Sequence, residues 1–124
     1  MRVARNLLTA LVGLMLGCVS NANQFSFPPD RPLEVVLLSG NGNPRSYQIE
    51  ASDVRNVKLR TWLAANQVGW SIYPATPPGQ GILVSGGELR LQFVGTSVLA
   101  CQKKQACLQR NIKEAEYAFL KGKA

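Results

Sequence analysis

The stretch ILVSGGELRLQFV, residues 82–94, decides the fold class because it places two strand patterns on either side of a glycine turn. Within 89–93 apolar residues alternate with Arg90 and Gln92, so the apolar side chains point inward and the polar ones outward. The glycine-rich residues 86–88 form the turn. The segment therefore predicts a β-hairpin with one face against a hydrophobic core.

A second hairpin is predicted earlier in the chain. LEVVLLS, residues 33–39, is apolar on both sides of its alternation, which is typical of a central, buried strand. GNGNP, residues 40–44, follows with residues suited to tight turns. RSYQIE, residues 45–50, alternates polar and apolar residues and places Tyr47 and Ile49 on one face.

One helix is predicted between the two hairpins. VRNVKLRTWLAANQ, residues 54–67, lacks Gly and Pro and has apolar residues at helical spacing. Trp62 falls on the apolar stripe, so we expect it in the core. Ser52 is expected to cap the helix, with Asp53 in the first turn. WSIYP, residues 70–74, then predicts a short strand.

The rest of the chain predicts a loop and a final helix. ATPPGQG, residues 75–81, has two prolines and two glycines, which exclude regular structure, and SVLAC, residues 97–101, could extend the sheet. The last apolar residues recur at intervals of four, three and four, which predicts an amphipathic helix with an outward ion pair between Arg110 and Glu114. These apolar residues are Leu108, Ile112, Ala115 and Phe119.

Together these elements predict one α+β domain over residues 33–124. Their order is ββαβββα, with an antiparallel sheet of about five strands and two helices against it. A chain of this length supports one domain with a modest core.

Residues 1–17 have the layout of a secretory signal peptide. Two arginines precede an uncharged apolar run, residues 7–17, that is too short to cross a bilayer, which takes about 20 helical residues. LMLGC, residues 14–18, resembles the lipobox of bacterial lipoproteins. The resemblance covers only the leader and implies a lipid such as palmitate on Cys18. In that family Asp after the cysteine marks inner-membrane retention, so Val19 implies the periplasmic face of the outer membrane.

A different cleavage site competes with the lipobox. Ser20-Asn21-Ala22 has small residues at the two positions that a signal peptidase reads. Cleavage there would discard Cys18 and release a soluble periplasmic protein that begins at Asn23. The sequence leaves both alternatives open.

Residues 18–32 predict a tether between the anchor and the domain. They are polar and then rich in proline, which favours extended backbone. Phe25 and Phe27 are unusual in a linker. Two alternatives follow for them: they dock on the domain, or they lie at a bilayer interface.

Cys101 and Cys107 remain as a pair once Cys18 is acylated or removed. An exported protein with an even number of cysteines is expected to form a disulfide, which here would contribute about 2 kcal/mol. A continuous helix would place side chains six residues apart on different faces, too distant to bond. The disulfide therefore predicts a turn over residues 102–105.

Charge and composition narrow the classes of function. Without residues 1–17 the chain has twelve basic and seven acidic residues. In an exported protein this basic excess points to anionic envelope material before nucleic acid, but the charges are scattered along the sequence, which favours an ordinary, mildly basic surface. The chain has no histidine, which excludes Ser-His-Asp and Cys-His catalysis and any His-bearing zinc site. A carboxylate pair for glycoside cleavage remains, yet Glu50, Asp53 and Glu88 each have an ordinary structural role. We predict no enzyme and no cofactor.

Three groups of residues are candidates for binding a partner. The first is a basic and aromatic patch at the first helix, made of Arg55, Lys58, Trp70 and Tyr73, in which we expect Trp70 to be exposed. The second is a stiff loop that contains Pro77 and Pro78. The third is a cationic cluster around the disulfide, made of Lys103, Lys104 and Arg110, to which Lys121 and Lys123 could add.

These observations predict a small exported envelope lipoprotein whose domain is a non-catalytic interaction module for another envelope protein. A soluble periplasmic inhibitor or immunity-type protein that blocks a hydrolase is the first alternative, with the loop of residues 76–81 entering an active site. A carboxylate-based hydrolase of cell-wall glycan is the second.

Overall fold

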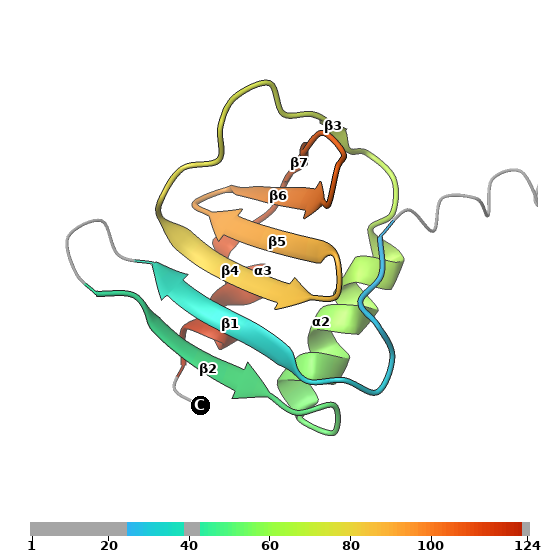
Figure 1. The fold of residues 1–124 in the computed structure, drawn as a ribbon, viewed down its shortest axis with the longest axis vertical. Coiled ribbons are helices and arrows are strands. Elements are labelled where there is room, and N and C mark those ends of the chain that lie inside the picture. The colour runs from blue at the N-terminus through green and yellow to red at the C-terminus, as the bar shows by residue number, and fades with distance from the viewer. Residues whose placement is uncertain (1–24, 39–42, 123–124) are drawn as a thin grey trace, which may run out of the picture.

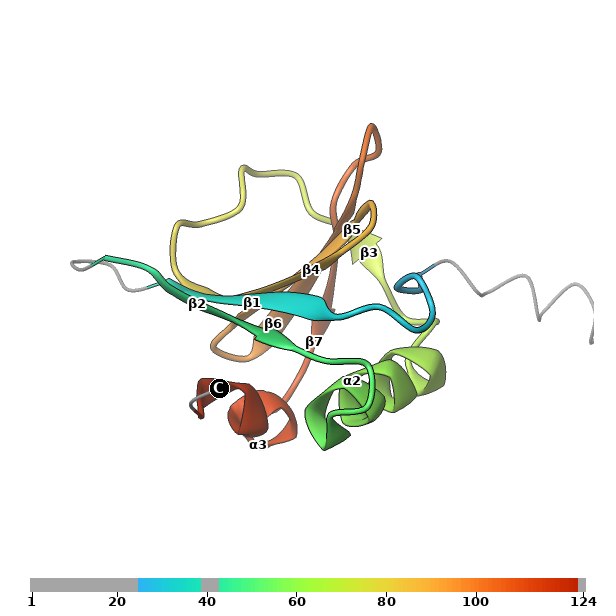
Figure 2. The ribbon, with the colours of Figure 1, turned by 60° about the horizontal axis from the view of Figure 1, so that its bottom comes forward.

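The structure, a computed structural model, describes residues 25–38 and 43–122. Within them the chain forms an α+β domain, in which both helices lie on the same face of one antiparallel sheet (Figure 1, Figure 2). None of the helices in this part of the chain reaches the length and hydrophobicity that crossing a membrane requires. The predicted leader and Cys18 lie outside the described residues.

The described sheet has seven strands in the order β2-β1-β4-β5-β6-β7-β3. The strands are β1 (Leu33–Leu38), β2 (Arg45–Ile49), β3 (Ser71–Ile72), β4 (Gly81–Gly86), β5 (Leu89–Val94), β6 (Ser97–Gln102) and β7 (Leu108–Asn111). The helices are α2 (Val54–Ala65), α3 (Glu114–Tyr117) and the 3-10 helix η2 (Ala118–Lys121).

The predicted hairpin of residues 82–94 is the centre of the sheet. Strands β4 and β5 pair with Ile82 opposite Phe93 and Gly86 opposite Leu89. The inward side chains of β5 are buried, as predicted. Gln92 lies on the other face of the sheet, as its place in the alternation requires, but it is only 4% exposed. Its amide donates hydrogen bonds to backbone oxygens of the loop that follows β3, so the loop covers it.

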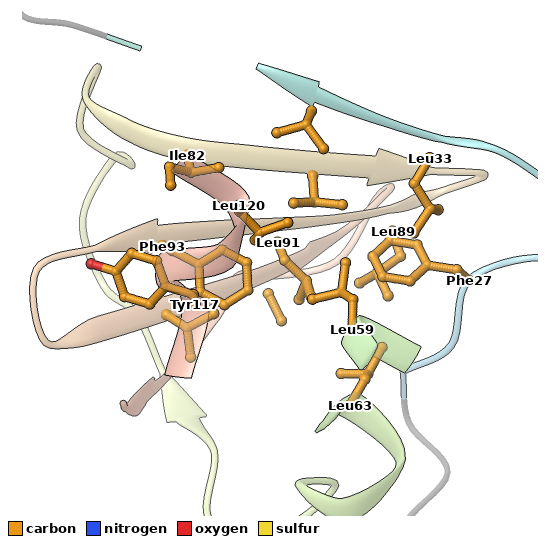
Figure 3. Close-up of a cluster of buried hydrophobic side chains, with 14 of the residues drawn as sticks. Phe27, Leu33, Leu59, Leu63, Ile82, Leu89, Leu91, Phe93, Tyr117 and Leu120 are labelled. Carbon is orange, nitrogen blue, oxygen red and sulfur yellow. The ribbon is translucent and has the colours of Figure 1, made fainter. Parts of the chain in front are cut away.

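The core lies between the sheet and the helices (Figure 3). Leu59 and Leu63 of α2 face the sheet, whereas Val54 and Val57, which lie close to the same stripe in sequence, are exposed. Trp62 is half-buried and packs against the core. Other core side chains come from the inner face of the sheet and from the C-terminal helices: Leu33, Val35, Ile49, Val84, Leu89, Leu91, Phe93, Val98, Tyr117 and Leu120.

The C-terminal part of the sheet differs from the prediction of about five strands. Residues 97–102 form β6, and Leu108–Asn111, expected to begin a helix, form β7. The disulfide turn brings Leu108 opposite Ala100, where backbone pairing with β6 prevails over the helical spacing of side chains. The helix shortens to α3 and η2. Glu114 therefore pairs with Lys121, at 3.6 Å, and not with Arg110.

The start of α2 and the length of β3 also differ from the prediction. Asp53, not Ser52, is the N-cap of α2, because its side chain accepts a hydrogen bond of 2.8 Å from the backbone N–H of Arg55. The strand expected over residues 70–74 is confined to Ser71–Ile72, where it pairs with the first two residues of β7.

Residues 25–31, the strap, are packed against the domain although the sequence placed them in a tether. Phe25 and Phe27 are each 4% exposed. Of the two alternatives for these side chains, the structure therefore shows the one in which they dock on the domain. Gln67 binds the backbone of Phe25 twice: its Oε1 accepts from the Phe25 N–H at 3.1 Å, and its Nε2 donates to the Phe25 oxygen at 2.8 Å. A buried amide thus satisfies both backbone groups of one residue.

Arg60 binds the rest of the strap through hydrogen bonds, and two glycines of the β4–β5 turn leave room for it. The Arg60 guanidinium donates to the backbone oxygens of Phe27 at 3.2 Å and Pro28 at 2.8 Å. Phe27 and Pro28 lie so close to the β4–β5 turn that a Cβ atom on Gly86 or Gly87 would come within 2.8 Å of them. Gly87 also has φ of 59°, where glycine is favoured. The absence of a side chain at these two positions therefore lets the strap pack closely against the turn.

Replacement of Phe27 by alanine tests whether the strap is part of the core. We expect F27A to lower the free energy of unfolding by about 3 to 5 kcal/mol, because a buried aromatic side chain is lost and leaves a cavity. Urea denaturation measures the change. S26A, at the exposed neighbouring position, is the control and should stay within about 0.5 kcal/mol of wild type. Equal stability of F27A and wild type would show that the strap does not contribute to folding.

Candidate binding surfaces

A basic groove lies between the β4–β5 turn and the turn that joins β6 to β7. Its cavity has a volume of about 420 Å³ and is open to solvent. Arg90, Lys103 and Lys104 supply its positive charge, and Glu88 is the carboxylate among its lining residues. The remaining lining residues are polar, small or disulfide-bonded: Ser85, Gly87, Cys101, Gln102, Gln105 and Cys107, with Leu89.

The disulfide fixes the turn that carries two of these cations. Cys101 and Cys107 are bonded, as predicted, with their Cα atoms 4.3 Å apart. The turn over residues 102–105 is confirmed: the N–H of Gln105 donates to the oxygen of Gln102 at 3.0 Å. Lys104 has φ of 65°. Both Lys103 and Lys104 are exposed, so a rigid base presents their ammonium groups to solvent.

Arg110, which the sequence grouped with these lysines, belongs elsewhere. Its guanidinium donates to the backbone oxygen of Val68 and, at 2.8 Å, to the side chain of Asn66. It therefore secures the end of α2. Arg90 takes the place beside the disulfide because it pairs directly across from Cys101. The strand register, which the sequence pattern alone does not fix, is the signal that finds Arg90.

A second concave surface, the distal groove, lies at the other end of β4. Two adjoining cavities of about 340 and 400 Å³ share Leu38, Gly81, Ile82 and Lys121. The strand ends form an apolar floor, and charged side chains lie at the margin. The other lining residues are Leu37, Asn43, Arg45, Gln80, Phe93, Val94, Gly95, Glu114 and Tyr117. The sequence prediction missed this groove, since its residues are distant along the chain.

Residues 73–80 form a wide loop, the arch, that stands out from the sheet (Figure 1). One end is bonded through the N–H of Tyr73 to the oxygen of Cys107 at 2.8 Å. At the other end the Gln92 amide donates to Pro78 at 2.6 Å and to Gln80 at 2.8 Å. Pro77 and Pro78 are half-buried. The arch adjoins the distal groove through Gln80, so one partner could contact both.

The basic side chains of the predicted basic and aromatic patch make contacts within the domain. Arg55 binds Asp53 and lies over the Tyr47 ring, with its guanidinium carbon 5.2 Å from the centroid. Lys58 lies over the Phe119 ring at 4.7 Å. These contacts stabilise the helix against the sheet and the C-terminus.

Trp70 is half-buried rather than the exposed aromatic that we expected. Its ring contacts that of Phe25, with centroids 5.0 Å apart, and its indole N–H donates to the oxygen of Asn66 at 2.7 Å. Trp62, packed on the core, donates to Glu116 at 3.1 Å. The docked strap is the cause, because Phe25 supplies the apolar partner that covers Trp70.

The carboxylates are arranged for structure. Hydrogen bonds from the Arg55 side chain and backbone lower the pKa of Asp53 from 3.8 to about 2. The backbone N–H of Lys113 and the indole of Trp62 likewise lower the pKa of Glu116. A catalytic acid needs the opposite shift. Among the described residues, no three acidic or cysteine side chains gather to form a metal site.

Comparison with known proteins found no family model, curated protein or solved structure that matches the chain.

The low pKa of Asp53 predicts a dependence of stability on pH. We expect D53N to have a lower Tm than wild type at pH 7, because asparagine keeps the cap but loses the charge that binds Arg55. The folded-state pKa of about 2 lies below 3.8, so the benefit of the charge is lost as pH falls from about 4 to about 2. Thermal unfolding over this range measures it, with E50Q as the control. An equal difference at every pH would contradict the assignment.

Removal of the disulfide is expected to cause a moderate loss of stability. The double variant C101S/C107S opens a short loop, so we expect its free energy of unfolding to fall by about 2 kcal/mol. Urea denaturation measures the change, and wild type treated with dithiothreitol should lose a similar amount. If neither sample loses stability, the backbone alone holds the turn.

Proposed function

We propose that the protein is a small exported lipoprotein, anchored through Cys18 at the periplasmic face of the outer membrane. Its domain acts as a non-catalytic module that binds another envelope protein. The leader pattern around LMLGC supports the anchor, and the disulfide suits an oxidising compartment outside the cytosol.

The distal groove with the adjoining arch is the observation that carries the proposal of a binding module. Its apolar floor is built from strand residues of the core, including Ile82 and Phe93, so the surface is formed before a partner arrives. Arg45 and the ion pair of Lys121 with Glu114 at its margin add charged groups that select the partner and orient it. An apolar centre with a charged rim is typical of protein interfaces.

The state of the acidic side chains supports a role without catalysis. Glycoside cleavage by a carboxylate pair requires one acid with a raised pKa. The two carboxyl groups with altered pKa, Asp53 and Glu116, both shift downward. Glu50 and Glu88 are exposed at a strand end and at a turn.

One observation favours the alternative of a soluble inhibitor. The two bonds from Gln92 hold the base of the arch in place, and a stiff protruding loop loses little entropy when it enters an active site. In that case the leader would be cleaved after Ala22, and the arch alone would contact the hydrolase.

The first experiment separates these alternatives by intact mass. Membrane and soluble fractions of a bacterial host that expresses the full chain are analysed. We expect a membrane-bound species that begins at Cys18 and carries lipid mass. A soluble species that begins at Asn23 would overturn the anchor and favour the inhibitor.

The second experiment locates the partner surface. A photocrosslinking amino acid replaces Gly79 on the arch, where a side chain has open space around it, or Leu38 in the distal groove. The control replaces Val54, which is 75% exposed on α2. We expect both test positions to capture the same envelope protein and the control to capture none. Capture of a hydrolase by Gly79 alone would favour the inhibitor, and equal capture at Val54 would overturn the assigned surface.

A further inference from the structure

We propose that the basic groove binds the head groups of anionic phospholipids in the membrane that holds the lipid on Cys18. This inference rests on the proposed anchor at Cys18, and it assigns the basic groove a partner different from that of the distal groove. Three observations carry it: the length of chain before the strap, the place where the strap meets the groove, and the charges in the groove.

The chain between Cys18 and the strap is short. Seven residue steps separate Cys18 from Phe25 in sequence. A fully extended chain covers at most about 3.6 Å per residue, so these steps span no more than about 25 Å. A compact domain of about 100 residues has a radius of gyration near 13 Å and is therefore roughly 34 Å across. The tether therefore excludes orientations in which Phe25 points away from the membrane, and it favours those in which the side that bears Phe25 faces the bilayer.

The basic groove lies on that side. Pro28 of the strap packs against Gly87, and Gly87 lines the groove. In Figure 1 the β4–β5 turn and the end of β6 lie toward the side at which the N-terminal segment joins the domain, whereas the start of β4 lies at the opposite side. The anchor therefore brings the basic groove to the bilayer and leaves the distal groove accessible to a protein partner.

The charges in the groove are available to an external anion. In the part of the chain that the structure describes, the ion pairs are Arg55–Asp53 and Lys121–Glu114. Arg90, Lys103 and Lys104 take part in neither, and Glu88 is the carboxylate that lines the groove with them. The cationic side chains are exposed and spread over an open surface rather than buried around one point. Such an array suits a layer of anionic head groups better than a single bound ion.

Exposed apolar side chains near the strap support contact with a bilayer interface. Val68 and Ile72 are 64% and 66% exposed, and they flank Trp70, whose ring contacts Phe25. Apolar side chains next to cations are typical of surfaces that rest in the head-group region.

The test measures which lysines the membrane protects. Mature protein purified from membranes is inserted into vesicles of phosphatidylcholine alone or mixed with phosphatidylglycerol, and a membrane-impermeant amine reagent labels its lysines for mass spectrometry. We expect phosphatidylglycerol to reduce labelling of Lys103 and Lys104 about fivefold, and high salt to restore it. Lys58 on α2 should be labelled equally in both vesicles. Equal labelling of Lys103 and Lys104 in both vesicles would overturn the proposal.

A flotation assay tests whether the basic groove binds anionic lipid even if the protein carries no anchor. If intact mass shows no lipid, the proposed anchor fails, and the mature protein is floated with the same two kinds of vesicle. We expect binding to phosphatidylglycerol vesicles only, weakened about 30-fold by K103Q/K104Q. The control K58Q/K113Q removes the same charge at two exposed lysines that line neither groove, and it should bind as wild type. Equal weakening by both variants would mean that net charge, and not the groove, binds the membrane.

Discussion

Two polar side chains, Arg60 on α2 and Gln67 just beyond its C-terminal end, hold the strap and determine how this small domain is closed. Gln67 and Arg60 satisfy the backbone of a segment that enters the core without joining the sheet. Unpaired backbone groups would make burial of Phe25 and Phe27 unfavourable. With these bonds in place, the described part of the molecule has no buried side-chain nitrogen or oxygen without a partner. The strap also fixes where the chain leaves the domain, and therefore which surface an anchor would bring to a membrane.

Local patterns predicted the elements whose side chains have a clear period and a clear end. The alternation in β5 and the turn at Gly86 and Gly87 predicted the central hairpin, and the stripe containing Leu59 and Leu63 predicted α2. The spacing of the two cysteines predicted the turn beneath Lys103 and Lys104, because a disulfide cannot form across six residues of continuous helix.

Features that depend on distant contacts were not predicted. The spacing from Leu108 to Phe119 fits a helix, but pairing with β6 makes its first residues a strand. Gln92 is buried by a loop, and Trp70 is half-covered by the strap, so neither local pattern reports the true environment. The same reason explains the binding surfaces: two groove lysines were found from sequence, whereas Arg90 and Leu38 join their grooves only through the strand register and the fold.

The contact between the strap and the β4–β5 turn has a consequence for the order of folding. The strap is the first segment of the domain to leave the ribosome, yet the glycines against which it packs lie about sixty residues later in the chain. Contacts between such distant segments form late, because closing a long loop costs entropy before any contact is gained. Phe25 and Phe27 therefore stay exposed until the central hairpin exists. The docking of the strap then marks the completion of the domain.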